Sequence, residues 1–374
     1  MGQWNEAKIG EIAEVKGGKR IPKGRKLIKE PNSHPYIRIR NLGKTKYMQL
    51  NTDYEYVDEE TQQMIARYIV NQGDILISVV GTIGLVGIVG NTLDKANQTE
   101  NCDKIINIKK VLSEYLYYYL VSSFGQDEIK KGTVGAVQPK LPLKNVKDII
   151  VKYPPIKEQK QIVEILSAID EKIELNETIN NNLEQQAQAI YQQMFIENQN
   201  PNWKEGKLSD LVAVKYGKDH KKLDGGCYPV YGSGGIMRYV EKPLYTGESV
   251  LIPRKGTLNN VMYVNGAFWS VDTMFYTEML RPNIAKFVYH FVKGKDLASL
   301  NAGSAVPSMT TNILNAMPLC VPDDKTLSSF EETVTPMYSQ MQENEKQSAN
   351  LANIRDTLLP RLMSGELEVS DIDL

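Results

Sequence analysis

The chain contains an internal repeat, in which residues 4–19 recur as residues 203–218. Seven of the sixteen positions are identical at a constant offset of 199 residues, and apolar positions recur at the same places. The identical residues of the first copy are Trp4, Glu6, Lys8, Val15, Lys16, Gly18 and Lys19. Self-similarity at a fixed offset indicates a duplicated structural unit. The repeat therefore predicts two related globular domains within the 374 residues.

Weaker matches continue the repeat through each half. Residues 73–77 (Gly-Asp-Ile-Leu-Ile) are echoed by residues 247–251 (Gly-Glu-Ser-Val-Leu), and each half ends in an apolar stretch that runs into proline. Each half also contains one short aromatic and apolar helix candidate, at residues 114–122 and 284–292. Residues 75–93 carry no charge but contain repeated glycines among Val and Ile, so they predict two buried strands and a turn rather than a membrane helix.

A long heptad pattern follows each half. Alternating steps of four and three residues select Ile162, Leu166, Ile169, Ile173, Asn176, Asn180, Leu183, Ala187, Ile190 and Met194. Adding 168 to each of these residue numbers gives a second set, Phe330, Val334, Met337, Met341, Asn344, Ser348, Leu351, Arg355, Leu358 and Leu362. We call each set a seam. Such a period predicts two long amphipathic helices. We expect Pro336 to kink the second helix or to delay its start.

A single amphipathic helix of this length needs a partner for its apolar stripe. One globular domain lies between the two helices, so they can pair antiparallel within the chain, with their polar pairs fixing the register. Alternatively, each helix packs on its own globular domain. The predicted segments are residues 1–155 and 199–322 for the globular domains, and residues 156–198 and 323–374 for the helices and the tail.

The distribution of charge is more informative than the net charge of -1. Residues 16–46 carry eleven basic residues, and Glu30 is the only acid among them. The second half has smaller groups, with four lysines between residues 215 and 222 and the pair Arg254 and Lys255. Basic loops on two domains are expected of modules that contact phosphates. The alternative is that these charges are merely solvated.

No motif indicates a catalytic centre. The three cysteines form no CxxC pair, the three histidines form no HExxH or HxH pattern, and no GxxxxGK[ST] phosphate loop is present. We therefore predict a non-catalytic chain without a metal site. The separated cysteines fit a reducing compartment, and residues 1–10 have no apolar core, so we expect a cytoplasmic protein without a secretory signal or membrane span.

Two phrases resemble a known family. The junction at residues 149–162 (Ile-Ile-Val-Lys-Tyr-Pro-Pro-Ile-Lys-Glu-Gln-Lys-Gln-Ile) and the tail at residues 358–367 (Leu-Leu-Pro-Arg-Leu-Met-Ser-Gly-Glu-Leu) are similar to phrases of the specificity (S) subunits of type I restriction–modification systems. The resemblance covers essentially the whole chain. The second junction, residues 318–323, departs from the pattern because it has one proline fewer and lacks Glu-Gln.

The resemblance implies a fold and a set of partners. Each half would be a target recognition domain of mixed α/β (α+β) fold with a curved mixed sheet, and the two helices would form an antiparallel coiled coil in a pseudo-twofold arrangement. The partners would be double-stranded DNA, two methyltransferase (modification) subunits and, in the full complex, restriction subunits. This chain would hold no cofactor, because S-adenosylmethionine, ATP and Mg²⁺ would be held by the partner subunits.

Candidate DNA contacts follow from the basic and polar loop residues of each half. In the first half we predict contacts from Lys19, Arg20, Lys23, Arg38, Arg40, Asn41, Gln138 and Lys140. In the second half we predict contacts from Lys218, Lys222, Tyr231, Ser233, Arg254, Lys255, Thr257 and Ser308. Lys and Arg would bind phosphates, and Arg, Asn and Gln are the side chains that most often recognise bases.

Two further interpretations remain open from the sequence. The chain could be the specificity subunit of a related type II system, in which one protein combines methyltransferase and nuclease. It could also be a bivalent scaffold that binds proteins and has no role with DNA.

Overall fold

The computed structural model describes residues 4–300 and 308–369. The chain divides into two compact units, each of which contains one globular domain and half of each long helix. Unit 1 comprises residues up to 177 together with those from 345 onward, and unit 2 comprises residues 178–344. The divisions therefore fall inside the two helices, whereas the segments predicted from the sequence end at the helix starts.

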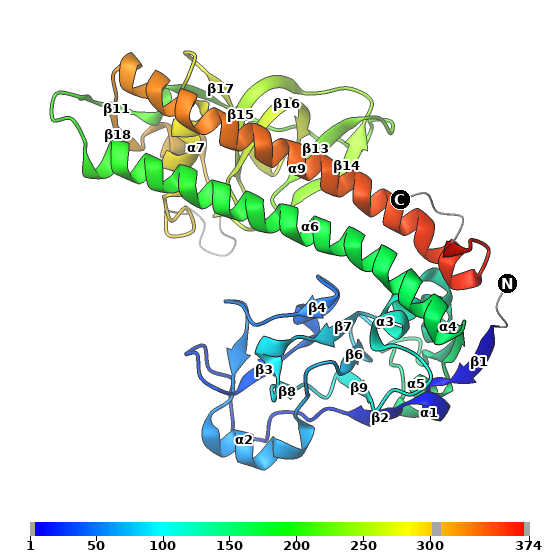
Figure 1. Ribbon diagram of the computed structural model, residues 1–374. Coiled ribbons are helices and arrows are strands. Elements are labelled where there is room, and N and C mark those ends of the chain that lie inside the picture. The colour runs from blue at the N-terminus through cyan, green and yellow to red at the C-terminus, as the bar shows by residue number, and fades with distance from the viewer. Residues whose placement is uncertain (1–3, 301–307, 370–374) are drawn as a thin grey trace. The chain divides into compact units, whose positions relative to one another are not determined.

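Unit 1 contains three sheets (Figure 1). A five-stranded sheet has the order β2-β9-β6-β7-β4, with β2 at Glu14–Gly17, β9 at Cys102–Ile106, β6 at Ile75–Ser78, β7 at Val86–Val89 and β4 at Tyr47–Met48. A three-stranded sheet has the order β5-β3-β8, at Glu55–Tyr56, Pro35–Ile37 and Asn97–Gln98. Strands β1 (Asn5–Lys8) and β10 (Ile150–Tyr153) pair with each other and connect the start of the domain to its end.

The helices of unit 1 contribute to two cores: those at residues 9–12, 113–132 and 143–148 pack with the five-stranded sheet, and the helix at residues 59–65 packs with the three-stranded sheet. The α-helices of its globular domain are α1 (Ile9–Ile12), α2 (Glu59–Ile65), α3 (Ser113–Val121), α4 (Ser123–Gly132) and α5 (Leu143–Asp148). Short 3-10 turns occur at Ile39–Asn41, Ala66–Tyr68 and Asn91–Leu93. Tyr115 and Leu116 of α3 are buried in one core with Ile75 and Ile77 of β6. The uncharged stretch thus forms the two buried, antiparallel strands that the sequence predicts, β6 and β7.

Unit 2 is built around one larger mixed sheet. Its order is β12-β17-β15-β16-β13-β14, with β12 at Val212–Tyr216, β17 at Met274–Met279, β15 at Tyr245–Pro253, β16 at Met262–Ser270, β13 at Tyr228–Gly232 and β14 at Gly235–Val240. Strand β11 (Lys204–Lys207) pairs with β18 (Pro318–Val321), as β1 pairs with β10. The remaining elements are a 3-10 turn at Leu208–Asp210 and helices α7 (Ala285–Lys293) and α8 (Thr311–Asn315).

The two long helices are α6 (Ile156–Tyr191), which continues as a π-helical turn over Gln192–Glu197, and α9 (Asp324–Ser364). In unit 1, Ile162 and Leu166 near the start of α6 share a core with Leu362 near the end of α9. In unit 2, Ala187 near the end of α6 shares a core with Phe330 near the start of α9. The helices are therefore antiparallel, and the predicted α/β fold with two long paired helices is confirmed.

All twenty positions of the two predicted seams are buried or half-buried. Their polar members contact one another within each unit. In unit 1, Asn176 Nδ2 donates to Gln347 Oε1 at 2.9 Å and to Ser348 Oγ at 3.1 Å. In unit 2, Asn344 Nδ2 donates to Asn180 Oδ1 at 2.8 Å. These contacts join the predicted pairs across the two helices.

The expectation of a delayed start at Pro336 is wrong, because α9 begins at Asp324 and continues through this proline. Proline removes one hydrogen-bond donor from a helix interior. Val334 and Tyr338 on either side of it are buried in the core of unit 2. Tertiary packing of this kind outweighs the local propensity of the chain.

Candidate nucleic-acid interface

A glycine–lysine pair fixes the start of one loop in each unit. In unit 1 the backbone N–H of Gly18 donates to the carbonyl of Cys102, and that of Lys19 donates to the carbonyl of Gln98. A Cβ atom on Gly18 would lie only 2.0 Å from the carbonyl oxygen of Thr99. Because no side chain fits so close to a backbone oxygen, this position requires glycine.

Unit 2 repeats this arrangement with different strands. Gly217 N–H donates to the carbonyl of Met274 at 3.0 Å, and Lys218 N–H donates to that of Ser270 at 2.8 Å. A Cβ atom on Gly217 would lie 2.0 Å from the carbonyl oxygen of Val271. The identity of Gly18 and Lys19 with Gly217 and Lys218 in the sequence repeat thus has a structural cause. We call each of these pairs the Gly-Lys anchor.

Further loops meet the anchor in unit 1. Strand β3 lies parallel to β8, so Ile37 pairs with Gln98, the residue that accepts the anchor's hydrogen bond. Arg38 precedes the 3-10 turn at Ile39–Asn41 that follows β3, and a Cβ atom on Gly81 would lie 3.5 Å from Ile39 Cδ1. Val80, before that glycine, forms a β-bridge with Lys140. We call this assembly, residues 18–20, 38–41, 80–82 and 138–140, the loop edge of unit 1.

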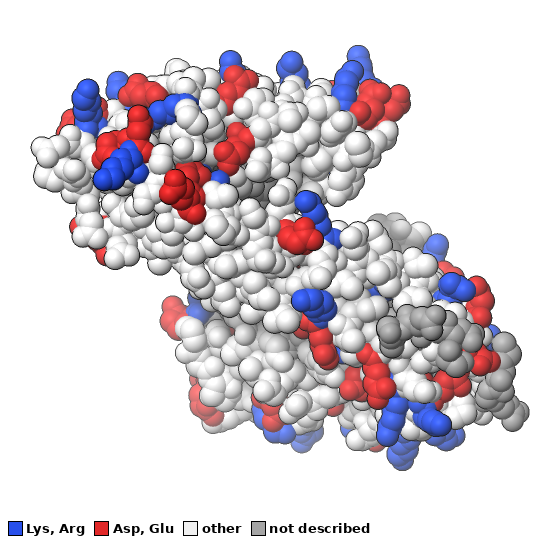
Figure 2. Space-filling model, turned by 45° about the horizontal axis from the view of Figure 1, so that its top comes forward, with Lys and Arg blue, Asp and Glu red and all other residues white. Residues whose placement is uncertain are grey.

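Acidic residues from outside the basic stretch pair with its arginines. Glu55 Oε2 accepts from Arg38 Nη1 at 2.6 Å and from Arg40 Nη2 at 2.9 Å. Arg20 Nε donates to Glu100 Oε1 at 2.6 Å. The basic excess of residues 16–46 is therefore partly neutralised in the folded domain. On the face shown in Figure 2, Lys and Arg side chains stand beside Asp and Glu rather than in a patch of one sign.

The other predicted residues of unit 1 differ in their exposure. Lys19, Lys23, Gln138 and Lys140 are exposed, and Lys19 Nζ lies 5.8 Å from the centre of the Tyr68 ring. Asn41 is buried, and its Oδ1 accepts a hydrogen bond from the backbone N–H of Arg38. This amide oxygen therefore holds the turn that presents the two arginines. The DNA contacts assigned to these residues stay predictions.

Unit 2 has a corresponding loop edge. Strand β13 lies parallel to β16, and Tyr231 pairs with Ser270, which also accepts the hydrogen bond of the anchor. Asn260 Nδ2 donates to the carbonyl of Ser233 at 2.7 Å. Gly256 lies against Ser233, and Lys255 forms a β-bridge with Ser308. We call residues 218, 231–233, 254–257 and 308 the loop edge of unit 2.

The lysines on and beside this second loop edge differ from the arginines of the first, because they form no ion pair in the described residues. Lys218, Lys222 and Lys255 are exposed, and within the described residues none of the three forms an ion pair. Arg254 stacks its guanidinium 5.4 Å from the centre of the Tyr216 ring, and Thr257 is exposed. The structure thus brings most of the predicted residues of unit 2 together, while Lys222 lies farther along the loop that follows the anchor.

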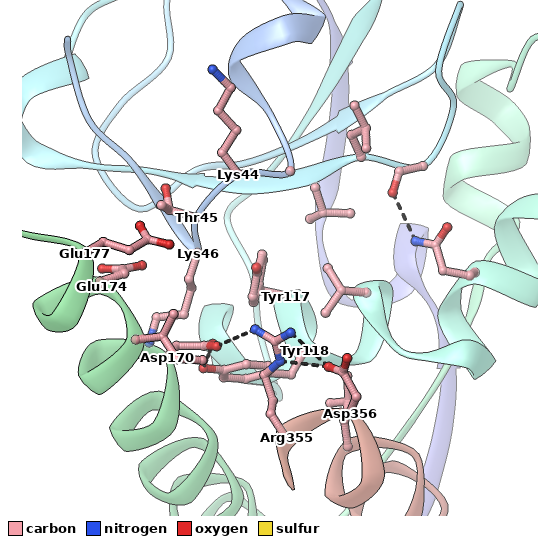
Figure 3. A pocket seen from close by; sticks show the side chains of 18 residues that line it. Lys44, Thr45, Lys46, Tyr117, Tyr118, Asp170, Glu174, Glu177, Arg355 and Asp356 are labelled. Carbon is pink, nitrogen blue, oxygen red and sulfur yellow. Dashed lines mark hydrogen bonds and ion pairs between the residues drawn. The ribbon is translucent and has the colours of Figure 1, made fainter. Parts of the chain in front are cut away.

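A polar cluster holds the globular domain of unit 1 on the long helices (Figure 3). Asp170 of α6 accepts from the Tyr118 hydroxyl at 2.7 Å and from Arg355 Nη1 of α9 at 2.9 Å. Burial, the largest influence, raises the pKa of Tyr118, so the phenol stays protonated and donates. These residues line a cavity of about 420 Å³ that is also lined by Glu174.

Lys46 shows what sequence reasoning missed in the basic stretch. Its side chain is buried and points to α6 rather than outward, with Nζ donating to Ser167 Oγ at 2.7 Å (Figure 3). It also lies 5.6 Å from the centre of the Tyr118 ring, within range of a cation–π contact. One of the eleven basic residues thus supports the fold. No local pattern distinguishes this lysine from its neighbours.

Unit 2 places a different pair at the equivalent positions. His290 of α7 and Tyr338 of α9 are hydrogen-bonded at 2.9 Å, and the other ring nitrogen of His290 meets Gln188 of α6 at 2.7 Å. Burial lowers the pKa of His290 to about 4, so its imidazole is neutral near pH 7. Nearby, the buried Lys286 pairs with Glu331 of α9 at 2.8 Å. The globular domain and both helices are joined in each unit, but by different chemistry.

The structure also bears on metal binding and on membrane insertion. Within the described ranges, no three His, Cys, Asp or Glu side chains gather in a way that could hold a metal ion. Among residues 4–300 and 308–369, no helix combines the length and the apolar character that crossing a bilayer requires.

Comparisons with known proteins identify relatives over the whole chain. The chain is 24% identical to the type I restriction enzyme MjaIX specificity subunit of Methanocaldococcus jannaschii, over 99% of this chain and 94% of the relative. It is 26% identical to the HindI specificity subunit of Haemophilus influenzae, over 58% of this chain and 46% of that protein. Its fold is similar to the crystal structure of a type I restriction–modification S subunit from M. genitalium, with a TM-score of 0.57, 18% identity and 96% of each chain covered.

The family model gives the most direct assignment. The model of the type I restriction modification DNA specificity domain matches residues 1–185 and 200–345. The two matched ranges correspond to the two copies of the repeat, and each includes one Gly-Lys anchor and its loop edge. The chain belongs to the family of type I restriction modification DNA specificity domains.

Proposed function

We propose that the two units of this specificity subunit each recognise one half of an asymmetric, bipartite DNA target. The proposal rests on one observation: the same Gly-Lys anchor begins a loop edge in each unit, while the side chains on the two edges differ. Equal scaffolds with unequal recognition residues are expected to bind two different short sequences. The bivalent protein scaffold has no such observation in its favour, and neither has the type II alternative.

Each loop edge combines the two kinds of contact that recognition needs. Exposed lysines such as Lys19 and Lys218 bind phosphates, which gives affinity and position without sequence information. Side chains that reach base edges give the specificity, with Arg suited to guanine and Gln suited to adenine. In unit 1, Glu55 holds Arg38 and Arg40 in fixed positions, which reduces the entropy that these arginines lose on binding.

The chain supplies recognition, and the partner subunits supply the chemistry. We propose that the paired helices dock two methyltransferase subunits and that restriction subunits join them in the full complex. S-adenosylmethionine, ATP and Mg²⁺ are assigned to those partners and none to this chain. Because such a complex acts on the chromosome, the proposal places the protein in the cytoplasm.

The test is to co-express the chain with its methyltransferase partner and to map the methylated adenines in exposed DNA. We expect one split sequence with two defined halves. Exchange of residues 199–322 for those of a relative should then change one half and leave the other intact. A change in both halves would count against independent recognition by the two units.

A binding measurement separates the scaffold interpretation. The affinity of the assembled complex for duplex DNA should fall steeply between two salt concentrations, because phosphate contacts release counterions. Binding to DNA that is weak and insensitive to salt would favour the scaffold instead.

A further inference from the structure

The hairpin formed by β13 and β14 carries apolar side chains that the fold leaves exposed. Ile236, Met237 and Tyr239 keep 50%, 60% and 52% of their surface accessible. Strand β14 is the last strand of the six-stranded sheet, so these side chains stand on an open edge. Exposed apolar residues on an edge strand promote aggregation unless a partner covers them.

A β-bulge in the hairpin changes the direction of the Met237 side chain. The pairing shifts between Val230 and Tyr231, which face Arg238 and Ile236, so Met237 is the extra residue of a β-bulge. A bulge bends its strand and re-aims a side chain. Gly232 on the opposite strand makes room for the re-aimed chain, because a Cβ atom there would lie 2.5 Å from Met237 Sδ.

Exposed lysines from the loop at residues 218–222 lie beside the hairpin, and Asp219 of the same loop accepts a hydrogen bond from the backbone N–H of Lys221 at 3.0 Å. Arg238 Nη2 donates to the carbonyl of Leu223 at 2.6 Å and thereby ties the loop that carries Lys221 and Lys222 to β14. Lys218 is tied to Tyr231 of β13 through Ser270. None of the three lysines forms an ion pair in the part of the chain that the structure describes. An apolar hairpin beside exposed lysines that form no ion pair in the described residues is complementary to a polyanion that displays apolar groups.

The hairpin also belongs to the loop edge of unit 2. Its tip residue Ser233 accepts a hydrogen bond from Asn260 and lies against Gly256, beside Lys255. A two-stranded ribbon braced in this way fits the major groove, which is about 12 Å wide. There the thymine C5-methyl is the apolar group on the base edges.

We propose that the β13–β14 hairpin enters the major groove of the DNA and that Ile236 and Met237 recognise thymine by contact with its methyl group. The lysines at 218, 221 and 222 hold the adjoining phosphates. This inference rests on the proposed function and adds to it one chemical feature of the half-target that unit 2 recognises: at least one thymine at a fixed position. Covering the tip with bases also explains why an edge strand bears such side chains.

The experiment uses the assembled methyltransferase complex and a duplex that contains its mapped target. The exchange of residues 199–322 identifies the half that belongs to unit 2. Each thymine of that half is then replaced by uracil, which lacks the methyl group but keeps the same hydrogen bonds. We expect one or two positions at which uracil weakens binding about fourfold, the effect of removing one buried methyl group.

Variants of the hairpin complete a double-mutant cycle, in which the DNA change is thymine to uracil and the protein change removes the contacting side chain. With Met237→Ala or Ile236→Ala, uracil and thymine should bind equally at the corresponding position, because the contact is already lost. The control is Leu280→Ala, since Leu280 is 57% exposed in the same unit but lies after β17, outside the hairpin. This variant should keep the fourfold preference for thymine.

Three results would overturn the inference. The first is a unit 2 half-target without thymine. The second is equal binding of thymine and uracil at every position by a complex that still methylates its site, which leaves the proposed function intact. The third is a hairpin variant that no longer binds its methyltransferase partner firmly but keeps its preference for thymine. That result would assign the apolar side chains of the hairpin to a contact with protein. Failure of the unaltered complex to recognise any DNA site would defeat the proposed function and this inference together.

Discussion

Two glycines show how single residues fix the loop edges. Gly18 and Gly217 occupy positions where a backbone carbonyl leaves no space for Cβ, and each precedes a lysine whose N–H joins a neighbouring strand. The sequence repeat marks both residues as special, since they are identical across the two copies. Glycine is required at these two positions because Gly18 lies against the carbonyl oxygen of Thr99 and Gly217 against that of Val271. These contacts cannot be inferred from the local sequence.

We predict that Gly217→Ala destabilises unit 2 by about 1–3 kcal/mol, the range typical of overpacked positions. The added methyl group would overlap the carbonyl oxygen of Val271, so the anchor must shift. Urea unfolding followed by circular dichroism measures the change. Gly225→Ala is the control, because a Cβ atom there meets nothing within 4 Å. Equal unfolding midpoints for the two variants would contradict the prediction.

His290 should make the stability of unit 2 depend on pH. Burial, with a smaller contribution from Lys293 that Glu184 opposes, lowers its pKa to about 4, while an unfolded histidine titrates near 6.5. Between these values the unfolded chain binds a proton that the folded chain does not. The free energy of unfolding therefore falls as the pH falls through this window, by up to about 1.4 kcal/mol per pH unit.

The measurement compares the native protein with His290→Gln at pH 7 and pH 5. The native protein should lose more stability than the variant on acidification, because the other titrating groups, Glu184 included, are common to both. If the two proteins show the same difference between the two pH values, His290 does not account for the dependence.

At the same scale, the candidate site was only partly predictable. The exposed lysines could be chosen because basic, glycine-rich loops seldom lie in a core. The pairing of Arg38 and Arg40 with Glu55 was not predicted, although the acidic residues between positions 53 and 60 gave a signal. The burial of Lys46 had no signal, since it depends on Ser167 and Tyr118, which are remote in sequence.

Among the elements, the long helices were the most predictable. A heptad pattern is local information repeated many times, so the helices and their facing residues follow from it. Pro336 was the exception, because the buried neighbours Val334 and Tyr338 hold the helix together there. The order of strands within the sheets was not predictable, since it is set by pairing between distant segments such as β2 and β9.

The polar contacts between the helices should fix their register at some expense of stability. In unit 2, Asn180→Ala removes the acceptor of the Asn344 amide at 2.8 Å, and removal of one partner of a buried hydrogen bond costs about 1–3 kcal/mol. The double variant Asn180→Leu with Asn344→Leu should recover that stability or exceed it. Thermal unfolding followed by circular dichroism compares the stability of the native protein, Asn180→Ala and the double variant. A double variant that is less stable than Asn180→Ala would refute this account.

At the scale of the whole molecule, duplication was the most informative property of the sequence. It predicted two similar domains and two helices, and the paired edge strands β1–β10 and β11–β18 reproduce the repeat in structure. The pseudo-twofold relation of the two halves stays a prediction. The charge balance of the loop edges was harder to predict, because the arginines of the first edge pair with Glu55 and Glu100, which are remote in sequence.

The salt dependence of DNA binding should reveal whether Lys222 contacts a phosphate. In the assembled complex, Lys222→Gln should reduce the slope of the logarithm of affinity against the logarithm of salt concentration by roughly 0.9, the value for one lost phosphate contact. Lys204→Gln, which removes the same charge from exposed strand β11, should leave the slope unchanged. Equal slopes for the two variants would exclude a phosphate contact from Lys222.

The division of the chain into units has a consequence for its synthesis on the ribosome. Unit 2 is one continuous segment, residues 178–344, whereas the core of unit 1 needs Leu359, Leu362 and Met363, which are translated slightly more than 200 residues after α6 begins at Ile156. The domain that is translated first is therefore completed last. A nascent chain arrested after residue 344 and cleared of the exit tunnel should resist protease in its later part while its earlier part is still digested.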